Sequence, residues 1–161
     1  MKNLPIKKIL IWGLGLFVLI QLIPVNRDNP PVTEEIQLPQ HIKTTFERSC
    51  YDCHSNKTKW PWYSYVAPVS WLLSKHVQDG RKHLNFTEWD KYDAKKRANK
   101  LEEILDEIED GTMPLPGYLR LHPEAVLSGA DIDAIADWYD SLADSLENEA
   151  ETSSDDAEDH D

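Results

Sequence analysis

Apolar residues form one continuous run near the N-terminus of the 161-residue chain. From Ile9 to Val25 the only strongly polar residue is Gln21, and three lysines but no acidic residue precede the run. This length is close to the minimum for a membrane-spanning helix. The preceding lysines are expected to stay in the cytoplasm while the following residues are exported. We therefore expect residues 1–25 to form a single-pass N-terminal transmembrane helix in the cytoplasmic (inner) membrane.

The same run also has the length and the basic flank of the hydrophobic region of a cleaved signal peptide. After Leu22, however, the sequence offers no small-x-small site of the kind that signal peptidase prefers. This absence favours an anchor that is retained. In both cases the chain beyond Val25 lies on the exported side, so we expect the rest of the protein in the periplasm.

Beyond residue 39, apolar residues recur at helical spacing and nowhere alternate as they would in a strand. The fold class is therefore predicted to be all-α. The expected helices cover about His41 to Cys50, an apolar stretch within 66–77 that stops at Gly80, 94–108 followed by a left-handed cap at Gly111, and a last helix from Ser128 to Leu142 with Asp131 in a capping box.

Composition separates this domain, expected over residues 40–143, from its flanks. Residues 26–39 contain three prolines and few apolar residues, which predicts an extended spacer. Residues 144–161 hold nine acidic residues and no Lys or Arg, so this tail is expected to be disordered. Because the tail carries most of the formal net charge of −12, the domain is close to balanced. No basic surface is predicted, which argues against nucleic acid as a partner.

Both cysteines of the chain lie in Cys50-Tyr51-Asp52-Cys53-His54, which has the spacing of a c-type haem attachment site. Two thiols on one turn can each add to a vinyl group of haem, and the adjacent histidine is then placed to coordinate the iron. The motif occurs once, so we expect one covalent haem c, held by Cys50 and Cys53, with His54 as a metal ligand.

Three other readings of the cysteine pair remain open. A thioredoxin-type redox pair belongs near a βαβ pattern, and none is visible around Cys50. A structural zinc site needs four ligands, usually from two separated pairs, and the chain has no second cysteine pair. A disulfide between Cys50 and Cys53 would close a very short loop and stabilise the fold little.

A second axial ligand is sought among the methionines and histidines of the domain. Met113 is the only methionine beyond residue 1, and it lies in a proline-containing loop before the last predicted helix. A methionine in this position resembles the second ligand of a class I cytochrome c, and we therefore predict Met113 as a metal ligand. Filling a gap in the core is the alternative role of Met113. Among the histidines, His76 is the next candidate, because its predicted helix should pack near the cofactor.

Aromatic residues are concentrated within twelve positions of the domain. Large aromatic rings exclude water from a cofactor at little entropic cost, so we expect them to form a wall of the haem site. An ordinary core or an exposed docking surface is the alternative. The residues predicted to bind the cofactor in this way are Trp60, Trp62, Tyr63 and Trp71.

Several motifs together resemble the bacterial haem-binding domain family, whose members occur chiefly in Bacteroidetes and are single-haem and cytochrome c-like. The resemblance covers most of residues 40–140. It implies a covalent c-type haem on Cys50 and Cys53 with His54 as iron ligand, in an exported domain behind an N-terminal anchor. The segments that carry it are Cys50–Asn56, Trp60–Tyr63, Ala67–Trp71, His76–Arg81, Leu84–Phe86 with Trp89, Met113–Leu115, and Tyr118 with Leu121–Pro123.

These observations predict a membrane-anchored monohaem cytochrome that passes electrons between larger, unidentified redox proteins and is not an enzyme. The alternative is a haem-based ligand sensor or a small haem enzyme, in which Met113 is not coordinated and an open iron position accepts a gas or peroxide. Six-coordinate iron that does not bind carbon monoxide supports electron transfer, and five-coordinate iron that binds carbon monoxide supports a sensor or small enzyme.

Overall fold

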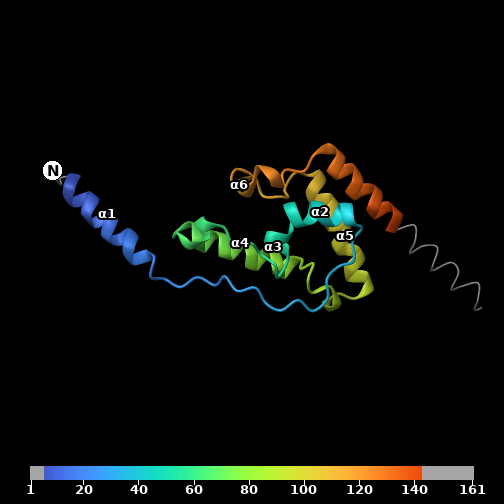
Figure 1. The fold of residues 1–161 in the computed structure, drawn as a ribbon, viewed down its shortest axis with the longest axis horizontal. Coiled ribbons are helices and arrows are strands. Elements are labelled where there is room, and N and C mark those ends of the chain that lie inside the picture. Colours follow the sequence, from blue (N-terminus) through green and yellow to red (C-terminus); the bar gives the residue numbers. More distant parts are fainter. Residues whose placement is uncertain (1–5, 143–161) are drawn as a thin grey trace, which may run out of the picture.

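The computed structural model of the protein describes residues 6–142. The predicted acidic tail, residues 144–161, lies outside this range. The helices are α1 (Ile6–Ile20), α2 (Gln40–Ser49), α3 (Tyr51–His54), α4 (Val69–His83), α5 (Ala94–Glu109), α6 (Pro116–Leu119), the short 3-10 helices η1 (Trp62–Tyr65), η2 (Trp89–Lys91) and η3 (Pro123–Ala125), and a last helix over residues 129–142 (Figure 1). Besides helices, turns and loops, this range contains only an isolated bridge between Glu34 and Glu88. The predicted all-α class is therefore confirmed.

The N-terminal helix α1 stands apart from the helical domain (Figure 1). It has 15 residues, and none of its side chains is buried. Its last turn tightens, because the backbone N–H groups of residues 21–23 donate to the carbonyls three residues earlier, and Pro24 then prevents further helix. Within residues 6–142, no helix combines the length and the apolar character that a membrane crossing requires. The transmembrane helix predicted for residues 1–25 is thus not found.

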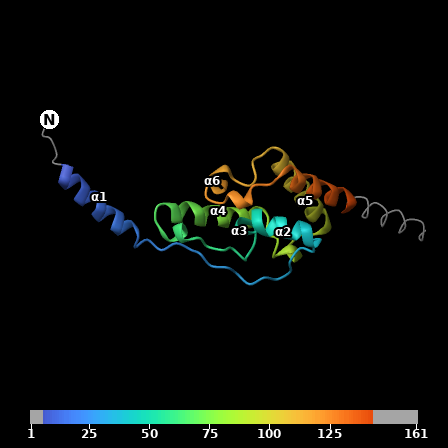
Figure 2. The same cartoon turned by 45° about the horizontal axis from the view of Figure 1, so that its top comes forward.

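The proline-containing segment, residues 26–39, runs extended along the domain (Figures 1 and 2). Ser74 Oγ donates to Asn26 O at 2.6 Å, and further along Ile36 N donates to Phe86 O at 2.8 Å. Ile36 is itself buried in the core. The segment predicted as a spacer therefore makes several contacts with the domain surface.

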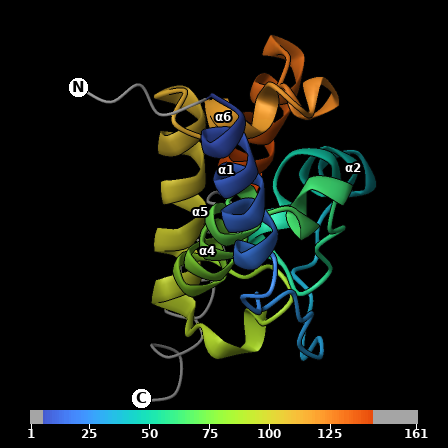
Figure 3. The same ribbon diagram turned by 90° about the vertical axis from the view of Figure 1, so that its left-hand side faces the viewer.

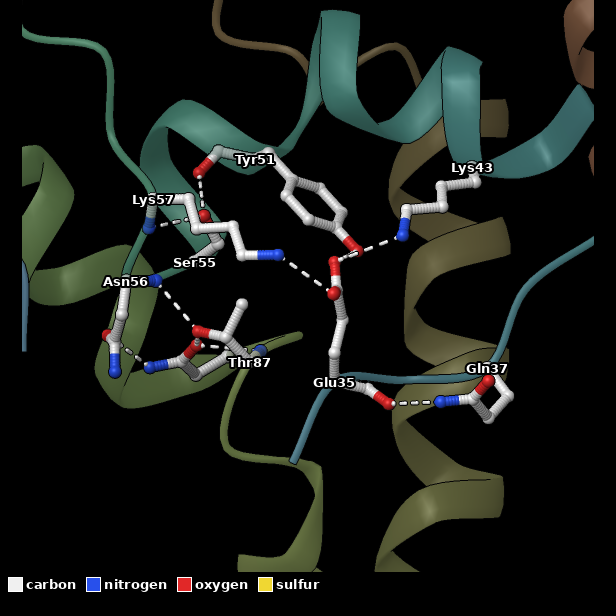
Figure 4. Close-up of polar contacts among 9 residues, drawn as sticks. Glu35, Gln37, Lys43, Tyr51, Ser55, Asn56, Lys57 and Thr87 are labelled. Carbon is white, nitrogen blue, oxygen red and sulfur yellow. Dashed lines mark hydrogen bonds and ion pairs between the residues drawn. The ribbon is translucent and has the colours of Figure 1, made fainter. Parts of the chain in front are cut away.

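Glu35 fastens this extended segment to the helices that carry the cysteines (Figure 4). Its carboxylate accepts hydrogen bonds from Tyr51 Oη at 3.0 Å and Lys57 Nζ at 2.8 Å, and Lys43 Nζ lies 3.6 Å away. Burial alone would raise the pKa of Glu35, but the bonds from Lys57 and Tyr51 and the charge of Lys43 lower it below its ordinary value. A charged Glu35 thus joins the segment to both α2 and α3.

Helical spacing in the sequence correctly located the main core helices. Ile42 and Phe46 of α2 are buried, and the ring centroid of Phe46 lies 5.2 Å from that of Phe86 and 6.1 Å from that of Trp138 in the last helix. Leu101 and Ile108 of α5 pack into the same core. In the end-on view, α5 and α2 lie on opposite sides of α4 (Figure 3).

The predicted helix ends are confirmed at two positions and wrong at a third. Gly111 follows α5 with φ of 66°, as expected for a left-handed cap. Ser128 N donates to Asp131 Oδ2 at 2.8 Å, and Asp131 N donates to Ser128 Oγ at 3.2 Å, which completes the capping box. Gly80, in contrast, does not end α4, which continues to His83. The reason for a glycine there is tertiary and is given below.

Asp131→Asn is expected to lower the free energy of unfolding by about 1–2 kcal/mol at neutral pH, because the carboxylate caps the last helix and also accepts from Arg48 of α2 at 3.0 Å. Hydrogen bonds from Ser128, together with Arg48, lower the pKa of Asp131 to about 2. The native state therefore favours the charged form. This contribution is complete above the ordinary pKa near 4 and is lost as the pH falls through about 2.

Urea unfolding of the parent and of Asp131→Asn between pH 2 and 7 measures this difference. The gap between the two proteins should be widest above pH 4 and should close toward pH 2. Asp137→Asn, at an exposed position of the same helix, is the matched control. A gap that stays constant with pH would show that the charge of Asp131 is not what stabilises the helix.

Candidate haem site

The cysteine motif forms a single helical turn at the junction of α2 and α3. Cys50 ends α2, and its carbonyl accepts hydrogen bonds from Cys53 N at 3.2 Å and His54 N at 3.0 Å. His54 O in turn accepts from Phe86 N at 2.8 Å, which joins the end of α3 to the segment after α4. The turn thus carries Cys50, Cys53 and His54 close together and is held from both sides.

A cavity of about 500 Å³ opens beside this turn. This volume lies within the roughly 300–1,000 Å³ range of cofactor sites. Residues from α2, α3, α4, α5 and the segment before and within α6 surround it. The lining residues are Ser49, Cys50, Asp52, Cys53, His54, His76, Asp79, Gly80, His83, Leu84, Phe86, Lys100, Glu103, Ile104, Glu107, Ile108, Met113, Pro114, Leu115 and Tyr118. The structure therefore brings all four predicted attachment and iron-ligand residues to one cavity.

The ring of His54 is oriented by a backbone carbonyl. His54 Nδ1 lies 3.1 Å from Leu84 O. Because a carbonyl oxygen only accepts, Nδ1 carries the proton, and Nε2 of the neutral ring retains its lone pair for a metal. The pKa of His54 is below its ordinary value, because the effect of burial outweighs that of the hydrogen bonds to the backbone of Leu84 and Gly80, which raise the pKa. The neutral form that iron ligation needs is thus favoured.

The environment of the two thiols differs from that of a redox-active pair. Burial, with a smaller contribution from Cys53, raises the pKa of Cys50 to about 12. Burial and the neighbouring Asp52 raise the pKa of Cys53 to about 11. Thiol exchange requires a thiolate and hence a lowered pKa. The alternative of a structural zinc site also finds no support, because residues 6–142 contain no group of three or more His, Cys, Asp or Glu side chains arranged to hold a metal.

Helix α4 faces the cavity with His76, Asp79, Gly80 and His83, which follow one another at helical spacing. Gly80 lies directly against the cysteine turn. A Cβ atom placed on it would lie 2.7 Å from Cys53 O and 3.2 Å from the carbonyl carbon. Only glycine therefore lets α4 approach α3 this closely. In the sequence Gly80 predicts the end of a helix, whereas in the structure it lies within α4 and permits this close contact.

The loop that carries Met113 is tied at both ends. Thr112 N and Met113 N both donate to Glu107 O, at 3.1 and 3.0 Å, as α5 ends. At the other end, Tyr118 Oη donates to Asp52 Oδ2 at 2.8 Å and so joins α6 to the cysteine turn. Met113 and His76, the two candidates for the second axial ligand, both line the cavity.

None of the four residues predicted as an aromatic wall lines this cavity. Trp62 is 78% exposed, and Trp60 lines a separate cavity of about 230 Å³. Tyr63 Oη lies 2.6 Å from His122 Nε2 in the segment after α6. Trp71 is half-buried on the side of α4 away from Gly80, and its indole nitrogen has no hydrogen-bond partner within residues 6–142. The aromatic residues that do line the cavity are Phe86 and Tyr118.

Sequence reasoning missed the contribution of α5 and of Ser49. Lys100, Glu103 and Glu107 line the cavity beside the apolar Ile104 and Ile108, and their spacing of three and four residues was the available signal. Ser49 Oγ is buried and has no partner within the described range. A buried polar atom of this kind is normally satisfied by a bound group or water. The donor set and the cavity therefore fit a haem.

Tyr118→Phe is expected to lower the free energy of unfolding by about 1.5–3 kcal/mol, since it removes a hydrogen bond to a carboxylate. Burial, and then the adjacent Asp52, raises the pKa of Tyr118, so the hydroxyl stays protonated and donates throughout the physiological range. Thermal unfolding monitored by circular dichroism measures the loss. Tyr65→Phe, at an exposed ring, is the control and should change nothing. Equal stabilities of both variants would contradict a structural role for the Asp52–Tyr118 bond.

Comparison with known proteins agrees with this geometry. A family model described as a haem-binding domain matches residues 15–141, from within α1 to the last helix. The searches of curated proteins and of solved structures gave no match.

Proposed function

Because the chain belongs to the haem-binding domain family, we propose that it is a monohaem c-type cytochrome-like protein with haem bound covalently to Cys50 and Cys53. Cys50 and Cys53 would hold the haem through their Sγ atoms, each of which would form a thioether bond with one vinyl carbon while the thiol proton passed to the other, so no oxidant would be needed. The observation that carries the proposal is the single turn on which both thiols and His54 reach the same cavity.

His54 and Met113 are proposed as the two residues that would hold the iron. The hydrogen bond between His54 Nδ1 and Leu84 O directs the choice of Nε2 as ligand atom. Met113 is supported by its place in the cavity, on a loop held by Glu107 and, through Tyr118, by Asp52. When bound, haem supplies a one-electron iron couple, and a thioether ligand raises its potential. The protein is accordingly proposed to transfer electrons between redox partners rather than to catalyse a reaction.

A membrane location on the periplasmic side completes the proposal. Its support is the apolar character of α1, whose side chains are exposed from Ile6 to Leu19 and half-buried only at Ile20. Lys7 and Lys8 lie at the start of this helix, on the side expected to remain in the cytoplasm. We propose that α1 inserts into the cytoplasmic membrane and tethers the haem domain to it.

Absorption spectra of the full-length protein, produced with the haem-attachment machinery, test the function. We expect low-spin spectra, oxidised and reduced, that carbon monoxide does not change, and the weak long-wavelength band of sulfur-ligated ferric iron. In Met113→Ala the band should vanish and carbon monoxide should bind. His76→Ala, at the competing position, is the matched control and should keep the parent spectrum. Carbon monoxide binding by the parent would favour a ligand sensor or small haem enzyme instead.

A further inference from the structure

An apolar patch lies exposed on η1 and the first turn of α4. It consists of Trp62, Tyr65, Val69 and Leu72, and we call it the η1–α4 patch. Trp62 is 78% exposed and Leu72 57% exposed, although Trp62 is among the largest apolar side chains of the domain. Val69 and Leu72 are three residues apart and so share one face of α4. Exposed apolar side chains on two elements that contact each other, as η1 and α4 do, are typical of a binding surface.

The chain leaving α1 is fastened at the base of this patch. Gln21 makes two hydrogen bonds with the backbone of Ala67, between η1 and α4: Ala67 N donates to Gln21 Oε1 at 2.9 Å, and Gln21 Nε2 donates to Ala67 O at 3.3 Å. Arg27 donates to Ser64 O at 3.1 Å, and its guanidinium carbon lies 4.4 Å from the centre of the Tyr65 ring. The end of α1 and the patch are therefore parts of one surface.

The length of α1 sets the depth of this surface. Fifteen residues at 1.5 Å each span about 22 Å, whereas the hydrocarbon core of a bilayer is about 30 Å thick. Measured from the cytoplasmic surface, a helix this short ends within the hydrocarbon core, and the residues from Gln21 to Val25 complete the crossing. Of these, Leu22 and Ile23 are exposed and apolar as that depth requires. Ala67, which forms two hydrogen bonds with Gln21, is then held close to the periplasmic headgroups.

We propose that the η1–α4 patch rests in the headgroup region of the phospholipid bilayer that holds α1. Tryptophan and tyrosine favour this region because their rings are apolar and their polar edges stay hydrated. The neighbouring basic groups are Arg27, whose guanidinium lies over the Tyr65 ring, and Lys75, which pairs with Asp79, and they suit anionic headgroups. The inference rests on the proposed insertion of α1 and adds a second contact between the domain and the membrane.

The second contact has a functional consequence for the orientation of the haem site. Helix α4 carries the patch in its first turn and the cavity-lining residues His76, Gly80 and His83 further along. A tether through α1 alone would hold the domain to the membrane only through the residues that follow this helix. With the patch also in the headgroups, α4 holds the cavity at a defined height and direction above the membrane.

Photo-crosslinking of the full-length haem-loaded protein tests the proposal. The protein is reconstituted into vesicles of phosphatidylethanolamine with a minor share of phosphatidylglycerol, with p-benzoylphenylalanine in place of one residue at a time. We expect phospholipid adducts, detected by mass spectrometry, at Trp62 and Val69, and about tenfold fewer at Val32, as follows from interfacial burial of the patch. Val32 is 43% exposed and Val69 44%, but Val32 lies next to Thr33, which is hydrogen-bonded to Thr87 beyond the far end of α4, and is the matched control. Leu72 should give adducts as Val69 does.

Leu16, within α1, separates this proposal from the proposed membrane anchor. Adducts at Leu16 but not at Trp62 and Leu72 would overturn the patch contact and leave the anchor intact. Adducts at Trp62 and Leu72 but not at Leu16 would support the patch contact and overturn the insertion of α1. Protein–protein adducts at Trp62 in place of lipid adducts would overturn the inference in favour of a second copy on this surface.

Discussion

Replacing Cys50 and Cys53 together with serine is expected to abolish haem that survives denaturation, because serine hydroxyls do not form the thioether bonds. On a denaturing gel stained for haem, the signal should fall to background, about tenfold or more below the parent. The cavity, with His54 and Met113 in its lining, remains in this variant. Some non-covalent haem can therefore persist in the native protein, and the denaturing step is essential to the measurement.

The single variants Cys50→Ser and Cys53→Ser serve as controls for the double variant. Each keeps one thiol on the helical turn, so each should retain one bond to the haem and a positive stain. The pyridine haemochrome band of each should shift toward longer wavelength, because one vinyl group stays unsaturated. A positive stain from the double variant would disprove covalent attachment through this motif and would favour a function of the two cysteines as thiols.

Gly80→Ala is expected to destabilise the protein and to reduce its haem content. The added Cβ would lie 2.7 Å from Cys53 O, a backbone atom that cannot rotate away. Either α4 or the cysteine turn must shift, and overpacking of this kind costs about 1–3 kcal/mol. The shift also separates the α4 and α3 walls of the cavity. Urea unfolding of the protein without haem and the ratio of haem to protein after loading measure the two effects.

Gly129→Ala provides a control with the opposite expected sign. Gly129 lies in the first turn of the last helix, and an added Cβ would meet no atom within 4 Å. Alanine in a helix is favoured over glycine by up to about 1 kcal/mol, so this variant should be as stable as the parent or slightly more stable. Equal stability of Gly80→Ala and the parent would contradict the close packing of α4 on the cysteine turn.

The sequence by itself determined the features that depend on residues close together in the chain. Helix α2, helix α5 and the last helix follow from apolar spacing, since their hydrogen bonds join residues four positions apart. The capping box of Ser128 and the positive φ of Gly111 follow from residue types at fixed local offsets. The attachment motif is equally local, because one helical turn suffices to bring its thiols and His54 together.

Only the tertiary structure decided which surfaces meet. Four aromatic residues near the motif have the chemistry of a haem wall, but η1 turns Trp62 outward. A wall of the cavity is formed instead by α5, which begins 41 residues after Cys53. In the sequence, a glycine at position 80 fits both a helix end and a close contact between two helices. Only the position of Cys53 O in the structure shows that it makes the close contact. Local spacing defines the faces of a helix, whereas the partner of each face depends on how all the helices pack.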